Sequence, residues 1–418
     1  MTGEAAILDA SHLGPSMLSQ LLPTRRAFPV DDPIFALNAE ARARAAKGES
    51  IINATVGTLQ DDDGQMVILN TVMELWRELT PQEIAPYAPI AGDPAFLTGM
   101  VRRYWPDLED FGTGCATPGG SGALALSIRN FLESGEAVLS FSPYWSPYST
   151  LAAENGVRLE TYPLPAPGHL WDAPDLQRVL REILQRQGRL LIWFNDPCHN
   201  PTGRCSSPAG RAMLFEILRE LAYLGPITLL LDLAYLEYAA DPDDVMAALK
   251  DYATFAAEGA VLVGASLSVS KALTLYGARA GALVFPWTRD ETLQAALSMS
   301  CRGIFSNAPR APQSVVVRLA KDGNAQKRLA REQRHWTGIL QARAHALSDA
   351  LRAQKLPGIP WQGGFFVTLQ ADDPGGAAAK LKERGIYVVP MESGLRVGVC
   401  GLKAGDAAIF ALAYEESL

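Results

Sequence analysis

The sequence predicts an α/β protein with a mostly parallel sheet, followed by a smaller C-terminal region. Five short apolar runs are rich in β-forming residues and nearly continuous in hydrophobicity, which is typical of strands buried on both faces. Helical patterns lie between some of these runs, and strands that alternate with helices indicate a parallel sheet. The predicted strands span residues 137–141, 190–194, 227–231, 260–267 and 280–285.

Apolar residues spaced three and four apart predict the helices that accompany these strands. Residues 1–30 contain Pro15, Pro23 and Pro29, so we expect that segment to be irregular. Three helices are expected before the first of these strands and two more between strands. Their ranges are 34–47, 67–79, 123–132, 175–186 and 208–224.

The C-terminal region departs from this alternation. A long helical pattern runs from about residue 326 to residue 353, and short strands and helices follow it. This segregated order indicates a second, smaller domain. We expect its strands at 365–369, 387–389 and 395–400, and its helices at 377–384 and 405–414.

Composition and charge exclude several classes of protein. The 418 residues carry a net charge of −8, which disfavours a nucleic-acid partner because such proteins usually present a basic face. We find no signal peptide and no apolar run long enough to span a membrane. The five cysteines and five histidines show no ligand spacing, so neither a metal site nor a disulfide framework is predicted. A cytoplasmic location is expected.

Lys271 follows the apolar run at 260–267, in the segment Ser268-Val269-Ser270-Lys271. A lysine at a strand end can be desolvated, which lowers its pKa and makes the neutral amine available to react with a carbonyl group. Arg279 lies eight residues later, and an arginine beside two serines is a natural phosphate clamp. Taken alone, the segment fits a surface lysine after a strand even better.

Two further segments follow predicted strands. Asp232 closes the strand at 227–231, and ligands gather at the carboxyl ends of strands in open α/β sheets. A carboxylate there can pair with a pyridinium nitrogen, and the phenol of Tyr235 can reach the ring oxygen of the same cofactor. The amide of Asn200, in Asn200-Pro201-Thr202-Gly203, can bind that oxygen too. The plainer alternatives are an N-cap aspartate and an ordinary tight turn.

The segment Thr117-Pro118-Gly119-Gly120-Ser121-Gly122 opens the helix predicted from residue 123. Glycines before a helix expose backbone N–H groups, and the helix dipole favours an anion there, so the segment predicts a phosphate site. It is neither a dinucleotide-binding fingerprint nor a P-loop. A nucleotide-dependent α/β enzyme is therefore disfavoured.

Together and in this order, these segments resemble the fold-type I pyridoxal-phosphate (PLP) aminotransferases, and within them the aspartate/aromatic amino acid group of class I. The resemblance runs from about Asp32 to about Leu402, and its strongest matches are residues 118–124 and the lysine segment. It implies a large domain with a mostly parallel seven-stranded sheet and a smaller α+β domain. The expected division is an N-terminal segment with part of the small domain (1–62), the large PLP-binding domain (63–325) and the rest of the small domain (326–418).

The resemblance also implies a role for each matching position. Lys271 would hold PLP as a Schiff base and later shuttle the substrate Cα proton. Asp232 would bind the ring nitrogen and Trp145 would stack on the ring face. The remaining contacts would be Tyr235 and Asn200 to the ring oxygen, and Gly120, Ser121, Ser268, Ser270 and Arg279 to the phosphate.

Other matching positions imply a homodimer with shared active sites. Tyr87 would reach the phosphate in the neighbouring subunit. Arg396 would bind the substrate α-carboxylate in a bidentate pair, with Gly57 and Asn200 also at the substrate. Arg302 would come from the partner and bind a second, side-chain carboxylate, although a solvated arginine at a helix end is the plainer alternative.

The sequence departs from the aspartate group at several positions. Tyr148 and Asn195 stand where that group usually carries histidines behind the pyridine-binding aspartate, and Ser121 replaces a threonine. Phe35 and Thr55 differ from the usual residues of the substrate pocket. Strict aspartate specificity is therefore not predicted.

The expected activity is transfer of the amino group of an L-amino acid (aspartate, aromatic or similar) to a 2-oxo acid such as 2-oxoglutarate. A PLP-dependent lyase or decarboxylase on the same fold is an alternative, because these enzymes share the cofactor residues. A non-catalytic PLP-binding regulator is disfavoured, since the chain keeps the lysine and shows no DNA-binding segment.

Overall fold

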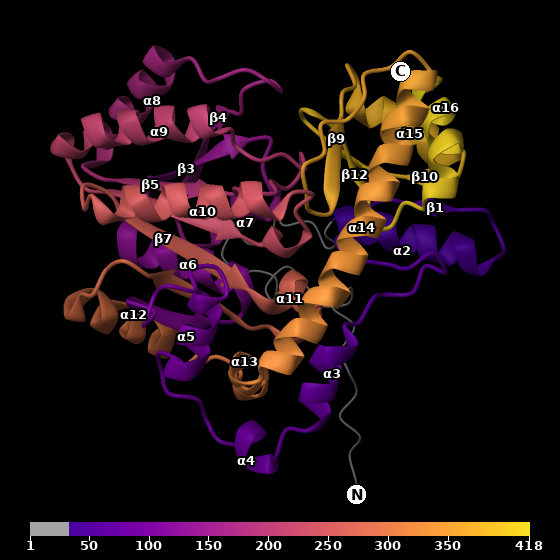
Figure 1. Ribbon diagram of the computed structural model, residues 1–418. Helices are drawn as coiled ribbons and strands as arrows, with labels where there is room; N and C mark the ends of the chain where they lie inside the picture. The colour runs from indigo at the N-terminus through magenta and orange to yellow at the C-terminus, as the bar shows by residue number, and fades with distance from the viewer. Residues whose placement is uncertain (1–32) are drawn as a thin grey trace, which may run out of the picture.

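The core of the computed structural model, which describes residues 33–418, is a seven-stranded sheet (Figure 1). Its strands lie in the order β2-β8-β7-β6-β5-β3-β4. Only β8 (Gly281–Phe285) runs antiparallel to its neighbours, which confirms the predicted mostly parallel sheet. The irregular segment expected at residues 1–30 lies outside the described residues.

The predicted strands of this sheet are all present, and two more complete it. The predicted five are β8 together with β3 (Ala137–Ser142), β5 (Leu190–Phe194), β6 (Ile227–Leu233) and β7 (Leu262–Ser268). The strands that were not predicted are β2 (Thr113–Thr117) and β4 (Arg158–Pro163). β2 consists of small and hydroxyl residues, and β4 is an edge strand with mainly polar side chains, so neither gives an apolar run.

Helices cover both faces of the sheet, because alternate side chains of a strand point to opposite faces. On β6, Leu229 and Leu231 belong to one hydrophobic cluster and Leu230 belongs to the other. The predicted helices here are α6 (Gly119–Phe131), α8 (Ala173–Gln187) and α9 (Pro208–Leu221). Those not predicted are α5 (Pro94–Arg102), α7 (Pro147–Glu154), α10 (Pro242–Ala257), α12 (Glu291–Ile304) and α13 (Arg310–Lys321).

The long helix α14 (Gly323–Ala353) leads from the large sheet to a region with two smaller sheets (Figure 1). One is the antiparallel sheet β11-β12-β9, and the other pairs β1 with β10 in parallel. The elements are β9 (Phe366–Leu369), β11 (Val389–Met391), β12 (Gly394–Gly398), β1 (Ile52–Asn53), β10 (Ile386–Tyr387), α15 (Pro374–Glu383) and α16 (Ala407–Glu415).

One expectation for this region was wrong. The single strand predicted at 387–389 is two strands in different sheets, since β10 ends at Tyr387 and β11 begins at Val389. Pairing of β1 with β10 brings the N-terminal segment against the C-terminal region, as do the contacts of α2 (Pro33–Ala46). The domain boundaries at 62/63 and 325/326 stay a prediction that this pairing supports.

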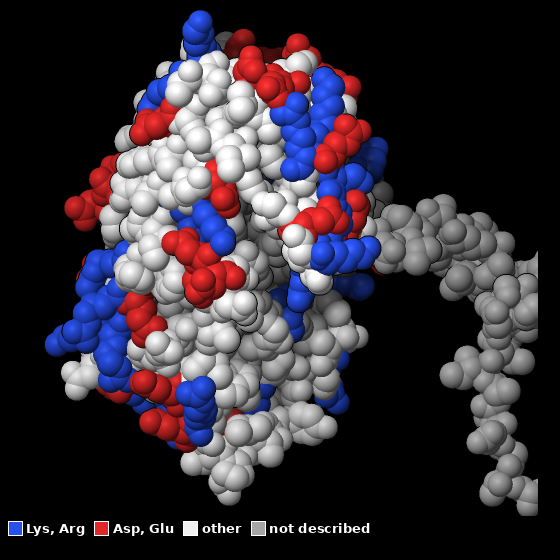
Figure 2. All heavy atoms as spheres, turned by 90° about the vertical axis from the view of Figure 1, so that its right-hand side faces the viewer, with Lys and Arg blue, Asp and Glu red and all other residues white. Residues whose placement is uncertain are grey.

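The charge of the surface and the length of the helices concern possible binding to nucleic acid or to a membrane. On the face that Figure 2 shows, lysine and arginine side chains are interspersed with aspartate and glutamate, and neither sign covers it alone. Among the helices of residues 33–418, none is long and apolar enough to cross a membrane.

Candidate active site

Segments that follow β2, β3, β5, β6 and β7 meet around a cavity of about 150 Å³. The carboxyl ends of parallel strands form this edge, which is where ligands bind in open α/β sheets. The cavity brings together every cofactor contact predicted from within one chain. These residues are Gly120, Ser121, Trp145, Asn200, Asp232, Tyr235, Ser268, Ser270, Lys271 and Arg279.

Lys271 lies on the short helix α11 (Val269–Ala272), directly after β7. The Ser268 hydroxyl caps this helix by accepting a hydrogen bond from the backbone N–H of Ser270 at 3.1 Å. Burial lowers the pKa of Lys271 to about 8, and the charge of Arg279 adds to this effect while Asp232 opposes it. A substantial fraction of the amine is therefore neutral near physiological pH.

Asp232, near the end of β6, accepts a hydrogen bond on Oδ2 from the hydroxyl of Tyr148 at 2.7 Å. Burial raises the pKa of Asp232 to about 6, whereas the Tyr148 hydrogen bond and the charge of Lys271 act in the opposite direction. The carboxyl group is therefore mostly ionised at neutral pH. Tyr148 is itself fully buried beside Trp193, with ring centroids 5.0 Å apart, so its hydroxyl is held in place.

Asn195, the second departure from the aspartate group, connects the end of β6 to the loop that carries Asn200. Its Nδ2 donates to the backbone oxygen of Asp232 at 2.7 Å, and its Oδ1 accepts from the backbone N–H of Asn200 at 2.6 Å. Asn200 in turn donates from Nδ2 to the Tyr235 hydroxyl at 3.2 Å. Within residues 33–418, the buried Oδ1 of Asn200 has no hydrogen-bond partner. An unsatisfied amide beside a phenol fits a site built for a polar ring substituent.

The opposite end of the cavity suits an anion. Helix α6 begins at Gly119 without a side-chain cap, so its first backbone N–H groups are directed outward with the positive end of the helix dipole. Arg279 donates from Nη1 to the Ser270 hydroxyl at 3.3 Å and lies close to α6. A Cβ on Gly119, which has φ of +72°, would lie 2.6 Å from Arg279 Nη2. Amides, hydroxyls and a guanidinium around such space are the donors that a phosphate group requires.

Arg396 lies on β12, outside the lining of this cavity. Its Nη2 donates to the backbone oxygen of Thr55 at 3.0 Å, and its guanidinium carbon lies 4.4 Å from the centre of the Phe366 ring. Burial is the main cause of the lowered pKa of Lys271, and the charge of Arg396 contributes. A Cβ on Gly57 would lie 3.1 Å from the same Phe366 ring.

The two residues expected to act across a subunit interface lie at the surface. The Tyr87 side chain is 89% exposed, and Arg302, in the last turn of α12, donates from Nη1 to the Ser306 hydroxyl at 2.7 Å. Neither lines the cofactor cavity of its own chain. Phe35 is also exposed, whereas the buried Thr55 hydroxyl donates to Asn53 Oδ1 at 2.6 Å.

Sequence reasoning missed some residues of the site. Leu124 and Ala234 line the cavity but carry no chemical signal of their own. Leu124 follows Gly120 by four residues and so lies on the same face of α6, which is the signal that could have found it. The roles of Tyr148 and Asn195 were left open by the sequence, and both hold Asp232 in place.

Comparison with known proteins agrees with this arrangement. Residues 49–412 match the family aminotransferase class I and II. A tyrosine aminotransferase of Rhizobium meliloti is 27% identical over 392 residues, which cover 90% of this chain and 95% of that protein. The cytoplasmic aspartate aminotransferase of Dictyostelium discoideum is 25% identical over 342 residues, covering 78% of this chain and 74% of its own length.

A solved structure shows the same similarity in three dimensions. The crystal structure of an aminotransferase from Anaerococcus prevotii superposes with a TM-score of 0.85 at 28% identity, covering 94% of this chain and 98% of that chain. The family match spans the large sheet, the cavity and the C-terminal region alike. The chain therefore belongs to the class I and II aminotransferases, enzymes whose cofactor is pyridoxal phosphate.

Proposed function

We propose that this chain binds PLP in the cavity through Lys271 and transfers the amino group of an L-amino acid to a 2-oxo acid, with 2-oxoglutarate as one acceptor. The main support for the proposal is that a buried lysine, a buried carboxylate and a group of anion-binding donors at the start of α6 all line one cavity. When bound, PLP supplies a protonated ring that stabilises the electron pair left on the substrate Cα after its proton leaves.

Lys271 has two tasks in this proposal. Its lowered pKa of about 8 makes the neutral amine available to bond the cofactor covalently. When a substrate amine takes its place, the same side chain would be the base that removes the proton from the substrate Cα. Asp232, mostly ionised at neutral pH, would accept a hydrogen bond from the ring N–H and so keep the ring protonated.

The donors at the start of α6 hold the phosphate, together with Ser268, Ser270 and Arg279. Trp145 would hold the ring face, and Tyr235 and Asn200 would bind the ring oxygen. Arg396 binds the substrate α-carboxylate, supported by its contact with the Thr55 backbone oxygen and by its burial, which strengthens the attraction between opposite charges. Gly57 lies beside this arginine through the shared Phe366 contact.

The active form in this proposal is a homodimer, in which Tyr87 and Arg302 complete the partner's site. Several large apolar side chains near Tyr87 and Arg302 in the sequence are exposed, which is expected of a surface that another subunit covers. Tyr87 itself is nearly fully exposed. The others are Met66, Ile68, Ile84, Ile90, Met299 and Ile304.

The substrate class follows from Arg302 if that dimer forms. A second carboxylate-binding arginine favours dicarboxylic substrates such as glutamate and aspartate, and the relatives named for aspartate and tyrosine support an aspartate, aromatic or similar donor. We also propose a cytoplasmic location. It is supported by one relative named as cytoplasmic and by five cysteines that are all free thiols.

Product analysis tests this activity against the lyase or decarboxylase alternative. The PLP-loaded protein is incubated with a panel of L-amino acids, with and without 2-oxoglutarate. We expect a 2-oxo acid and glutamate in equal amounts, and only when 2-oxoglutarate is present. Release of ammonia or carbon dioxide that does not depend on 2-oxoglutarate would favour the alternative.

A further inference from the structure

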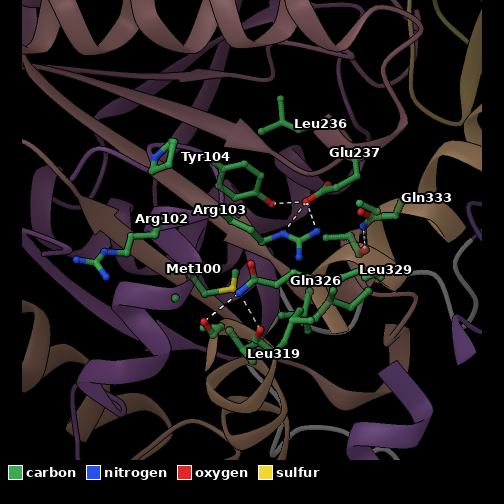
Figure 3. Close-up of a pocket in the computed structure, with 18 of the residues that line it drawn as sticks. Met100, Arg102, Arg103, Tyr104, Leu236, Glu237, Leu319, Gln326, Leu329 and Gln333 are labelled. Carbon is green, nitrogen blue, oxygen red and sulfur yellow. Dashed lines mark hydrogen bonds and ion pairs between the residues drawn. The ribbon is translucent and has the colours of Figure 1, made fainter. Parts of the chain in front are cut away.

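A second, larger cavity of about 770 Å³ lies behind the turn that carries Lys271. Its wall includes Val269, Ala272 and Leu273, and it shares only Ser268 with the cofactor cavity. The rest of the wall comes from α5 and the segment that follows it (residues 103–106), from α10, α13 and the start of α14, and from the short helix η4 (Leu236–Tyr238). We call this space the rear cavity, and Figure 3 shows the residues around it.

Most of the wall is apolar, and its size lies in the range of sites for small molecules. Met100, Leu319 and Leu329 surround the part that Figure 3 shows, and Leu249 and Leu273 extend it. An apolar body of a few rings or methylene groups would be removed from water here, which favours binding in proportion to the buried area.

One end of the rear cavity is polar and built around a buried charge pair. Arg103 donates from Nε at 3.2 Å to Glu237 Oε1, and its Nη2 lies 3.1 Å from the same oxygen. The Tyr104 hydroxyl also donates to Oε1, at 2.7 Å. Only 20% of the Arg103 side chain and 8% of the Glu237 side chain are exposed. Figure 3 shows the Arg103 guanidinium over the cavity, between Glu237 and Gln326.

The wall carries an excess of positive charge. Glu237 is the one carboxylate among the wall residues; Arg103 pairs with its Oε1, while its buried Oε2 has no hydrogen-bond partner within residues 33–418. The other charged residues of the wall are Arg102 and Lys321. Arg102 donates from Nε and Nη2 to the backbone oxygens of Leu108 and Glu109, so these bonds leave its charge uncompensated. An anionic head group complements this wall better than a cationic or neutral one.

We propose that the rear cavity is a second ligand site, which binds a small apolar carboxylic acid with its carboxylate at Arg103 and its body among the leucines. The ligand would pack against the back of the turn that holds Lys271. That turn is fixed from the same side by Gln333, whose Nε2 donates to the Ala272 backbone oxygen at 2.7 Å. The site therefore contacts the support of the reactive lysine without entering the cofactor cavity.

The probe for a test is 4-phenylbutyrate, and binding to the PLP-loaded protein is followed by titration calorimetry. Because Arg396 of the proposed active site also suits a carboxylate, two variants separate the sites. Ala330→Trp fills the rear cavity from α14, and Arg396→Met removes the other carboxylate contact. Ala342→Trp is the matched control, since Ala342 lies exposed on the same helix and outside the wall.

We expect Ala330→Trp to weaken binding of the probe at least ~10-fold, while Arg396→Met and Ala342→Trp leave a binding event of unchanged affinity. Binding that survives Ala330→Trp but disappears in Arg396→Met would place the probe in the active site and overturn the rear-cavity assignment. That outcome leaves the proposed transamination intact, so the two proposals fail separately.

The carboxylate assignment has its own test. Arg103→Gln should weaken 4-phenylbutyrate about 10-fold or more, and the neutral 4-phenylbutan-1-ol should bind the unmodified protein correspondingly weakly. Equal affinity for the acid and the alcohol would overturn the anionic specificity. If Arg103→Gln unfolds, as judged by its melting curve, the comparison of acid and alcohol decides alone, because it needs no variant.

Discussion

At the scale of single residues, the chemistry depends on how burial and neighbours set two pKa values in opposite directions. Burial lowers the pKa of Lys271 to about 8 and raises that of Asp232 to about 6. Between these values the lysine is partly neutral and the aspartate is ionised, which are the states that the proposed roles require. Tyr148 takes part by holding Asp232 ionised.

Attachment of PLP to the apoprotein should follow the titration of Lys271. Only the neutral amine reacts, so the rate should rise as pH increases through about 8 and become level above it. The measurement is the growth of the visible absorption band after PLP is added at a series of pH values. A rate that keeps rising to the pKa of an ordinary lysine would contradict the effect of burial.

Replacing Tyr148 by phenylalanine removes a hydrogen bond to the ionised form of Asp232. A hydrogen bond to a charged group contributes roughly 1.5–3 kcal/mol, so the pKa of Asp232 should rise by about 1–2 units. Less of the carboxylate is then ionised at neutral pH. The acid limb of the pH dependence of PLP affinity should therefore move to higher pH, and affinity at pH 6 should fall more than affinity at pH 9.

Tyr144→Phe is the matched control for this change. Tyr144 stacks parallel to Tyr148 at 6.5 Å between ring centroids, and no hydrogen bond joins it to Asp232. Its pH profile should stay that of the unmodified protein. Coincident profiles for all three proteins would show that the Tyr148 hydroxyl does not set the charge of Asp232.

At the scale of elements, the site depends on how strands and helices begin and end. Asp232 lies near the end of β6. Lys271 lies on α11, which directly follows β7, and the N-terminal amides of α6 follow the end of β2. The sequence predicted β6 and β7 because their apolar runs are continuous. It did not predict β2, whose residues Thr-Gly-Cys-Ala-Thr are small, so only pairing with β8 in the sheet identifies them as a strand.

The start of α6 gives a prediction at this scale. Gly119→Ala places a Cβ 2.6 Å from Arg279 Nη2 in a backbone conformation that L side chains rarely adopt. The arginine must move away from the first turn of the helix, so the phosphate loses one of its donors. We expect the affinity for PLP to fall ~10-fold or more, measured by fluorescence titration of the apoprotein.

Gly135→Ala separates backbone strain from the clash. Gly135 has φ of +86°, but a Cβ there meets nothing within 4 Å. This variant should lose stability, by roughly 1 kcal/mol, and bind PLP as the unmodified protein does. An equal loss of PLP affinity in both variants would show that strain, and not the approach of Arg279, is the cause.

At the scale of the whole molecule, the sequence predicted the large sheet and the residues of the cofactor cavity. It predicted less well the contacts that support those residues and the rear cavity. The cofactor residues follow strands and have distinctive chemistry, so their convergence could be expected from the sheet alone. The resemblance placed Tyr148 and Asn195 behind Asp232, but their hydrogen bonds to it could not be predicted, since the two residues come from different segments and meet it only in the folded chain. Arg103 and Glu237 of the rear cavity, 134 residues apart, gave no signal for the same reason.

Subunit mixing tests the proposed homodimer. Lys271→Ala lacks the lysine in its own site, and Tyr87→Ala lacks the tyrosine that it would lend to its partner. Each protein alone should be nearly inactive, but a mixed dimer has one site with both residues. Mixing after mild dissociation should restore roughly a quarter of the unmodified activity, since half the dimers are mixed and each has one good site. No gain on mixing would contradict a shared active site.

Peptide mapping is the most direct test of whether Lys271 carries the cofactor. The PLP-loaded protein is reduced with borohydride and digested, and the peptide that retains the cofactor is found by mass spectrometry. We expect label on Lys271 alone, no label in Lys271→Ala, and full label in Lys250→Ala, whose lysine is exposed on α10. Label on another lysine, or transamination at an unchanged rate in Lys271→Ala, would contradict it.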